Sequence, residues 1–186
     1  MSKGKYIIPL GDQNDMLLDK ELEAFNFEDP QKDPIKFAKE LIETMQENNG
    51  IGLAANQIGV PLKVFCMQTD PPMVCYNPRI TYASEETVIL DEGCLSYPGV
   101  WVKIERPQMI RCRFQDPYGN MVTKKFAGMA ARVFQHEMEH LEGKLFWKNA
   151  NWFNQEKFQK RWIKAKRTLR NAVRPPKKRK SKFRKK

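Results

Sequence analysis

The chain contains two histidines, and both fall in one short motif. His136, Glu137 and His140 form the pattern His-Glu-x-x-His. On a helix, residues four apart lie on the same face, so both imidazoles can reach one metal ion while the Glu137 carboxylate points into the same site. The motif therefore predicts a metal centre that hydrolyses its substrate.

A plainer interpretation of the motif is a structural one. Both imidazoles could pack in a core with satisfied hydrogen bonds, and Glu137 could be an ordinary surface acid. The apolar neighbours Val133, Phe134 and Leu141 argue against a surface position for Glu137. The metal site is favoured because this motif is rare in a short chain with so few histidines.

A metal held by two histidines needs at least one more protein ligand. No histidine remains, and after Glu142 the one acid is Glu156, in a strongly basic segment, so a downstream carboxylate ligand is a weak option. Cys94 lies in a loop-like Glu-Gly-Cys-Leu-Ser segment and is the remaining choice. A cysteine with two histidines leaves one coordination position open for water. The other cysteines lie in apolar, strand-like segments and are expected in the core: Cys66, Cys75 and Cys112.

The elements that must position these residues follow from the apolar periodicity. We expect a first helix over residues 34–48, the histidine helix from about 128 to 143, and a final helix over 151–173. Short strands are expected over 62–67, 73–76, 87–90, 100–105, 108–115 and 121–126, with turns at 70–72, 77–78 and 116–120. This order predicts an α+β fold, in which antiparallel β-sheets wrap around a central metal-binding helix, with further helices at the N-terminal and C-terminal ends.

Charge is distributed unevenly along the 186 residues. Residues 154–186 hold 16 Lys or Arg and one acid, whereas residues 1–153 hold 17 basic and 21 acidic side chains. We therefore expect a catalytic domain over 1–150, an amphipathic basic helix over 151–174, and a disordered basic tail over 175–186.

Several classes of protein are disfavoured by the sequence. No apolar run is long enough to span a membrane, and the first residues lack the apolar core of a signal peptide. Four cysteines without a secreted disulfide framework indicate a reducing, cytoplasmic location. Two alternatives to a metal-dependent amide hydrolase remain: an HExxH metallopeptidase, and a basic RNA-binding module whose histidine helix is structural.

Three segments together resemble the peptide deformylase family, in its bacterial type. They are Gly-Ile-Gly-Leu-Ala-Ala-Asn-Gln at 50–57, Glu-Gly-Cys-Leu-Ser at 92–96, and the histidine motif at 135–143. The resemblance runs from about residue 33 to 149, and is compatible with a phage or an organelle as the source. It implies removal of the formyl group from the N-terminal formyl-methionine of nascent polypeptides, with release of formate.

The resemblance also implies a role for each site residue. Cys94, His136 and His140 would hold one divalent metal ion, Fe²⁺ natively, with Zn²⁺, Ni²⁺ or Co²⁺ able to occupy the site. Glu137 would be the general acid and base, while Gln57 and the backbone N–H of Leu95 would stabilise the oxyanion. The substrate methionine would be bound by Gly50, Ile51, Gly52, Leu90, Glu92, Met129, Arg132 and Val133.

The basic C-terminal segment exceeds what catalysis requires. In the bacterial family a C-terminal helix contacts the ribosome, so the resemblance implies a ribosome or RNA contact here, with strong attraction to phosphate. The alternative is a solvated charged helix with no partner.

Overall fold

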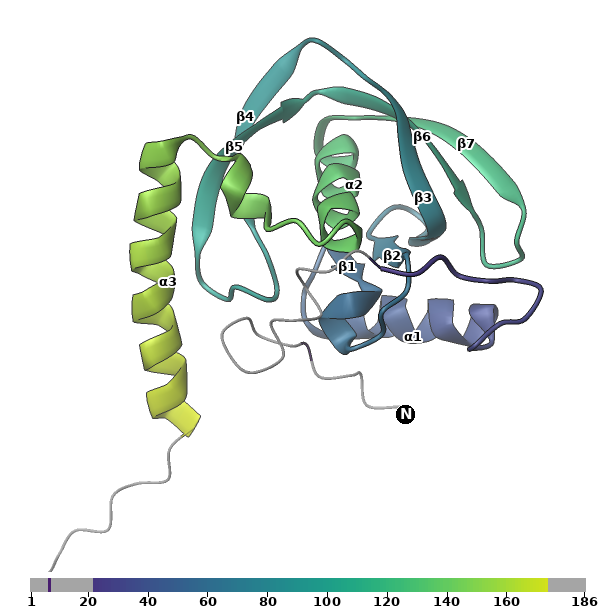
Figure 1. Ribbon diagram of the computed structural model, residues 1–186, viewed down its shortest axis with the longest axis horizontal. Helices are drawn as coiled ribbons and strands as arrows, with labels where there is room; N and C mark the ends of the chain where they lie inside the picture. Colours follow the sequence, from purple (N-terminus) through teal and green to yellow (C-terminus); the bar gives the residue numbers. More distant parts are fainter. Residues whose placement is uncertain (1–6, 8–21, 174–186) are drawn as a thin grey trace, which may run out of the picture.

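The structure is a computed structural model that describes residue 7 and residues 22–173 (Figure 1). The expected tail over 175–186 and the last residue of the 151–174 segment therefore lie outside the described residues. Within the described part, the elements in chain order are α1 (Pro34–Glu47), β1 (Gly52–Ala54), the 3₁₀ helix η2 (Ala55–Ile58), β2 (Val64–Met67), β3 (Met73–Ala83), β4 (Thr87–Gly93), β5 (Trp101–Pro107), β6 (Met109–Gln115), β7 (Met121–Ala127), α2 (Gly128–Leu141), the 3₁₀ helix η3 (Phe146–Asn149) and α3 (Trp152–Val173).

Two antiparallel sheets enclose helix α2. The larger sheet has the order β1-β2-β3-β6-β7, and the smaller is a ribbon of β4 and β5. In Figure 1, β3, β6 and β7 arch over α2, α1 lies below it, and the β4–β5 ribbon separates it from α3. The predicted α+β fold, with antiparallel sheets around a central histidine helix, is confirmed.

The inner face of the large sheet holds α2 through an apolar layer. On β6, the alternation expected for a half-buried strand buries Ile110, Cys112 and Phe114 at 1% exposure or less. Phe134 of α2 meets Phe65 of β2 edge to face, with ring centroids 5.0 Å apart. Because this side of α2 is occupied by the sheet, the histidine side faces the ribbon.

Strand β3 departs from the prediction. A turn was expected at residues 77–78, but β3 continues through them to Ala83, with a register shift between Tyr76 and Arg79. Asn77 has a positive φ of 48°, and its side chain exchanges hydrogen bonds with the backbone of Phe25, at 2.7 and 2.9 Å. A bulge stabilised by another segment therefore replaces the turn. The short strand β1 was not predicted at all.

Helix α3 is joined to the body through its first half. Phe158 and Trp162 are buried and pack edge to face on Tyr97, with centroids 5.3 and 4.9 Å away. Further along the expected apolar seam, Leu169 is 41% exposed, and Figure 1 shows the helix running past the ribbon. No helix in the described ranges has the length and apolar character that crossing a membrane requires.

Candidate metal centre

Three donor atoms from separate parts of the chain converge beside α2. The candidate ligand atoms of Cys94, His136 and His140 all lie within 4.8 Å of one another, and Cys94 Sγ is 3.3 Å from His140 Nε2. The two histidines stand on one face of α2, and Cys94 follows the last residue of β4. Burial lowers the pKa of His140 well below its usual value, which leaves the imidazole neutral, as a ligand must be. One thiolate and two imidazoles fit a divalent cation such as iron or zinc.

A buried carboxylate orients the first histidine. Glu92 Oε2 lies 3.0 Å from His136 Nδ1, so the other ring nitrogen is free to face the cluster. Burial opposes ionisation of Glu92, but hydrogen bonds from His136 and Arg106 lower its pKa to about 2. Glu92 is therefore an ionised carboxylate that accepts a hydrogen bond from the His136 Nδ1–H group.

Two arginines join the β4–β5 ribbon to α2. Arg106 Nη2 donates to Glu92 Oε2 at 2.9 Å and to Glu139 Oε2 at 2.9 Å, so one guanidinium bridges β4 and α2. Arg132 Nη1 donates to Glu92 Oε1 and to the carbonyl of Ile104, both at 2.9 Å. Both Arg132 and Glu92 were expected among the residues that bind the substrate methionine. The roles of Arg106 and Glu139 were missed, although Glu139 stands three residues after His136 on the same helix.

Glu137 is buried beside the donor cluster without a partner for one oxygen. Its Oε2 atom has no hydrogen bond within the described part of the chain, and burial raises the pKa of the carboxyl to about 7. Strand β1 passes so close that a Cβ atom on Gly52 would lie 2.3 Å from Glu137 Oε1 and 2.8 Å from Val133 Cγ1. Glycine is required at this position because any side chain would displace the carboxyl group.

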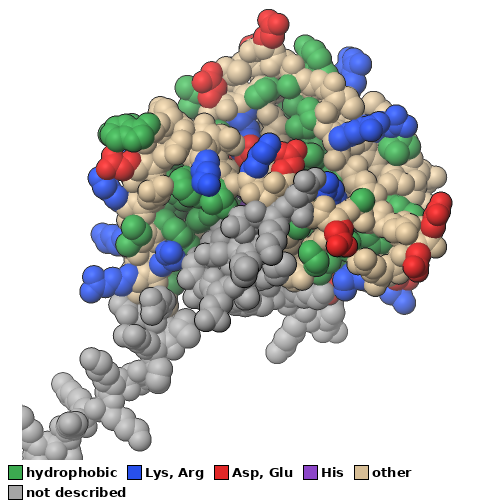
Figure 2. Space-filling model, in the orientation of Figure 1, with side chains coloured by type: hydrophobic (Ala, Val, Ile, Leu, Met, Phe, Trp, Pro, Cys, Tyr) green, Lys and Arg blue, Asp and Glu red, His purple; other side chains and the backbone are tan. Residues whose placement is uncertain are grey.

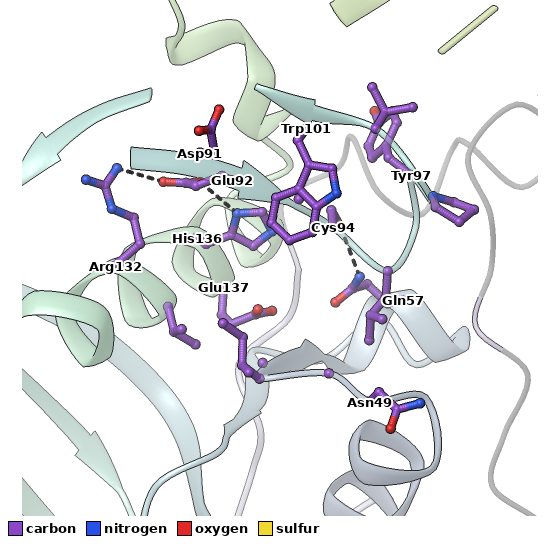
Figure 3. A pocket seen from close by; sticks show the side chains of 18 of the residues that line it. Asn49, Gln57, Asp91, Glu92, Cys94, Tyr97, Trp101, Arg132, His136 and Glu137 are labelled. Atoms are coloured by element: carbon purple, nitrogen blue, oxygen red, sulfur yellow. Dashed lines mark hydrogen bonds and ion pairs between the residues drawn. The ribbon is translucent and has the colours of Figure 1, made fainter. Parts of the chain in front are cut away.

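Gln57 directs its amide into the same space (Figure 3). The Oε1 atom accepts a hydrogen bond from the backbone N–H of Ala54 at 2.9 Å, which fixes the orientation of the amide. Its Nε2 group lies 3.4 Å from Cys94 Sγ and 3.1 Å from Ser96 Oγ. An amide donor is therefore held next to Cys94, and Leu95 lies between Cys94 and Ser96 in the loop.

A cavity of about 530 Å³ opens in front of the cluster (Figure 3). Of the residues expected to bind methionine, it is lined by Gly50, Ile51, Gly52, Glu92, Met129, Arg132 and Val133. Leu90, half-buried on β4, is not among the lining residues.

The cavity wall includes an aromatic side chain that sequence reasoning missed. Trp101 is 59% exposed and pairs across the ribbon with Gly93, and a Cβ on Gly93 would lie 3.0 to 3.1 Å from its indole ring. The ring therefore rests on the glycine that precedes Cys94. A tryptophan in the strand expected directly after the Cys94 loop is a signal that could have found it.

Comparisons with known proteins all lead to one family. A sequence model described as polypeptide deformylase matches residues 6–156. A peptide deformylase from Pseudothermotoga lettingae is 46% identical over 121 residues, which are 65% of this chain and 71% of that protein. The crystal structure of peptide deformylase from Thermotoga maritima has a TM-score of 0.74 and 35% identity, over 81% of this chain and 99% of that one. A peptide deformylase from Synechococcus elongatus, in complex with actinonin, has a TM-score of 0.76 and 29% identity, over 88% and 91%.

Proposed function

Because the chain belongs to the polypeptide deformylase family, we propose that Cys94, His136 and His140 hold its divalent cation and that Glu137 transfers the proton. The chain is a metal-dependent hydrolase that removes the formyl group from the N-terminal formyl-methionine of nascent polypeptides and releases formate. The observation that carries the assignment of residues is the convergence of the three donor atoms next to a buried carboxyl with one unpartnered oxygen.

The cation supplies Lewis acidity, which acidifies water and polarises a carbonyl. Glu137 takes a proton from the attacking water and returns it to the leaving amine, which must be protonated to depart. A carboxyl group with a pKa of about 7 is suited to both directions of transfer near neutral pH. Gly52 holds β1 against this carboxyl, so the backbone of the substrate strand can approach it.

Gln57 and the backbone N–H of Leu95 stabilise the negative charge that develops on the formyl oxygen. The amide orientation is preset by the hydrogen bond from Ala54, so no reorganisation is needed as charge develops. Loss of one such donor typically raises the barrier by about 2.7 to 4 kcal/mol.

The cavity residues bind the methionine side chain. Ile51, which directly precedes β1, and Met129 and Val133 of α2 form apolar walls of the cavity. The ion pair between Glu92 and Arg132 forms a polar part of the wall. A formyl group has no substituent beyond its hydrogen, so a tight first position next to Cys94 excludes longer acyl groups.

Fe²⁺ is the native metal in this proposal, and Zn²⁺, Ni²⁺ or Co²⁺ can occupy the site in purified protein. A thiolate with two imidazoles suits each of these ions, so availability decides which is bound. Metal analysis of protein purified without oxygen measures this directly, and a protein that holds none of these ions would contradict the assignment of the three ligands.

Formate release from a formyl-Met peptide, by protein prepared without oxygen, tests the catalytic assignment. Glu137→Ala should retain the metal and lose activity, because the proton carrier is gone. Glu142→Ala is the matched control, since this acid is exposed at the end of the same helix. Full activity of Glu137→Ala, or equal loss in both variants, would overturn the role of Glu137.

The basic C-terminal segment contacts the ribosome or RNA in this proposal. Exposed cations on α3, such as Lys157, Arg161 and Lys164, support it. Co-sedimentation with ribosomes should weaken when these three are replaced by Gln, and unchanged binding would remove the support. We place the chain in the cytoplasm, where nascent formylated chains are made and where its cysteines, free among the described residues, stay reduced.

A further inference from the structure

Positive charge is also concentrated on the large sheet, away from the metal centre. Strands β3, β6 and β7 contain no acid and five cations: Arg79, Arg111, Arg113, Lys124 and Lys125. Residues 1–153 as a whole hold more acids than bases, 21 against 17. The charge of these three strands is therefore opposite to that of the segment that contains them.

Strand register places like charges directly opposite one another. Arg79 pairs with Arg113 across β3 and β6, and Arg111 pairs with Lys125 across β6 and β7. All four side chains are exposed, and within the described ranges none of them forms an ion pair. Like charges opposite each other destabilise an antiparallel sheet. An anion bound between them would relieve this repulsion.

An exposed aromatic ring lies among these cations. Tyr82 pairs with Arg111 in the register of β3 and β6, and is 50% exposed. Tyr82, Met109, Arg111 and Lys125 line a groove of about 190 Å³. Single-stranded nucleic acids bind to surfaces that combine cations for the phosphates with aromatic rings on which unpaired bases stack. An acidic peptide would use the cations but has no base to stack on the ring.

The face is open to a partner. Alternate residues of β6 pack inward on α2, so Arg111 and Arg113 point to the outer side of the sheet. Figure 2 shows Lys and Arg side chains gathered where Figure 1 places β6 and β7, on the opposite side of the molecule from α3. Acids flank the face at the strand ends, in Glu85 and Glu86 at one end and Asp116 at the other. No residue of β3, β6 or β7 lines the catalytic cavity, so a ligand here leaves that cavity accessible.

We propose that this surface, the basic sheet face (Arg79, Tyr82, Arg111, Arg113 and Lys125), binds single-stranded RNA. The choice of RNA rests on the proposed function. An enzyme that acts on nascent polypeptides meets them close to ribosomes and messenger RNA, where RNA is the abundant polyanion. The face is separate from α3, so the inference does not depend on the C-terminal segment.

Binding is measured with the full chain and a fluorescent oligouridine of about ten nucleotides, within the usual range of single-strand sites. Arg111→Gln combined with Arg113→Gln should weaken binding at least about fivefold at low salt, and should lower the slope of log K against log salt by about 1.4, since each lost phosphate contact contributes about 0.7. Lys36→Gln combined with Lys39→Gln, on the exposed side of α1, is the control with the same net charge. Equal losses in the two double variants would overturn the proposal in favour of net charge alone.

A second variant and its matched control test the contact with the aromatic ring. Tyr82→Ala should weaken binding about fivefold or more through lost stacking, whereas Tyr118→Ala, which removes a tyrosine that is 73% exposed in the β6–β7 turn, should have little effect. Tighter binding of oligoglutamate than of oligouridine would identify an acidic protein as the partner and would overturn the proposal that this face binds RNA. Formate release should be unchanged in every variant, so failure of RNA binding is distinguished from failure of the proposed catalytic function.

Discussion

Arg106 and Arg111 carry the same guanidinium group only five residues apart, but their surroundings are opposite. Arg106 is 5% exposed and is bound by two carboxylates, the buried Glu92 and the half-buried Glu139. Arg111 is exposed, faces Lys125 across the strands, and forms no ion pair with a described residue. Charges between the ribbon and α2 are thus paired within the fold and orient His136, whereas the charges of the basic sheet face have no partner among the described residues and are open to another molecule.

Removal of Arg106 should have the largest effect on stability. Arg106→Met removes this partner from the buried Glu92 and the half-buried Glu139, and breaking a buried ion pair typically costs about 3 to 5 kcal/mol. Arg111→Met is the matched control and should change the free energy of unfolding by no more than about 0.5 kcal/mol, because it removes an exposed, unpaired charge. Urea unfolding of both variants measures the difference. Similar values for the two would mean that burial and pairing do not separate these arginines.

Gly52→Ala should lower kcat about 100-fold, because displacing a catalytic group by about 1 Å can reduce the rate by that factor. The added methyl group would occupy the space of the Glu137 carboxyl and of Val133. Metal content should be unchanged, because the atoms nearest to the added methyl group belong to Glu137 and Val133 and not to a proposed ligand. Loss of metal together with activity would show that β1 supports the ligands and not the proton carrier.

Glu92→Gln should weaken metal binding by about 10- to 100-fold, the usual effect of losing the carboxylate that orients a histidine ligand. The change keeps the shape of the side chain but removes the charge that His136 and both arginines use. Competition with a chelator measures the affinity. Glu142→Gln removes the same single negative charge from an exposed position, so it serves as the control and should leave the metal affinity unchanged.

Arg79→Glu should have the smallest effect, and in the stabilising direction. The substitution replaces a like-charge pair with an ion pair opposite Arg113, worth about 0.2 to 1 kcal/mol in a sheet. The gain should be visible in urea unfolding at low salt and should shrink at high salt, since exposed charges are screened. A gain that persists at high salt would have to come from packing, and no gain at low salt would show that the repulsion is negligible.

Much of the fold could be predicted from local patterns. The helix at Pro34–Glu47 begins after Asp33, whose side chain caps it, and the strand alternation of β6 follows directly from its sequence. The bulge at Asn77 could not be predicted, because it depends on hydrogen bonds to Phe25, 52 residues away. A local turn signal was overridden there by a contact distant in sequence.

The candidate site divides in the same way. His136, Glu137 and His140 could be placed together because four residues make about one helical turn, and Cys94 because no other ligand type remained. Arg106, Glu139 and Trp101 could not be assigned to the site, since their roles depend on the ribbon lying against α2 and on Gly93 lying under the indole ring.

By itself, the sequence determined the helix that carries the histidines, the types of side chain proposed as ligands, and the family to which the chain belongs, because these depend on short spacings and residue identity. Only the tertiary structure decided how charge is used. It buries Arg106 between two carboxylates and leaves Arg111 and Arg113 exposed beside other cations, since burial and cross-strand register depend on which segments meet in space.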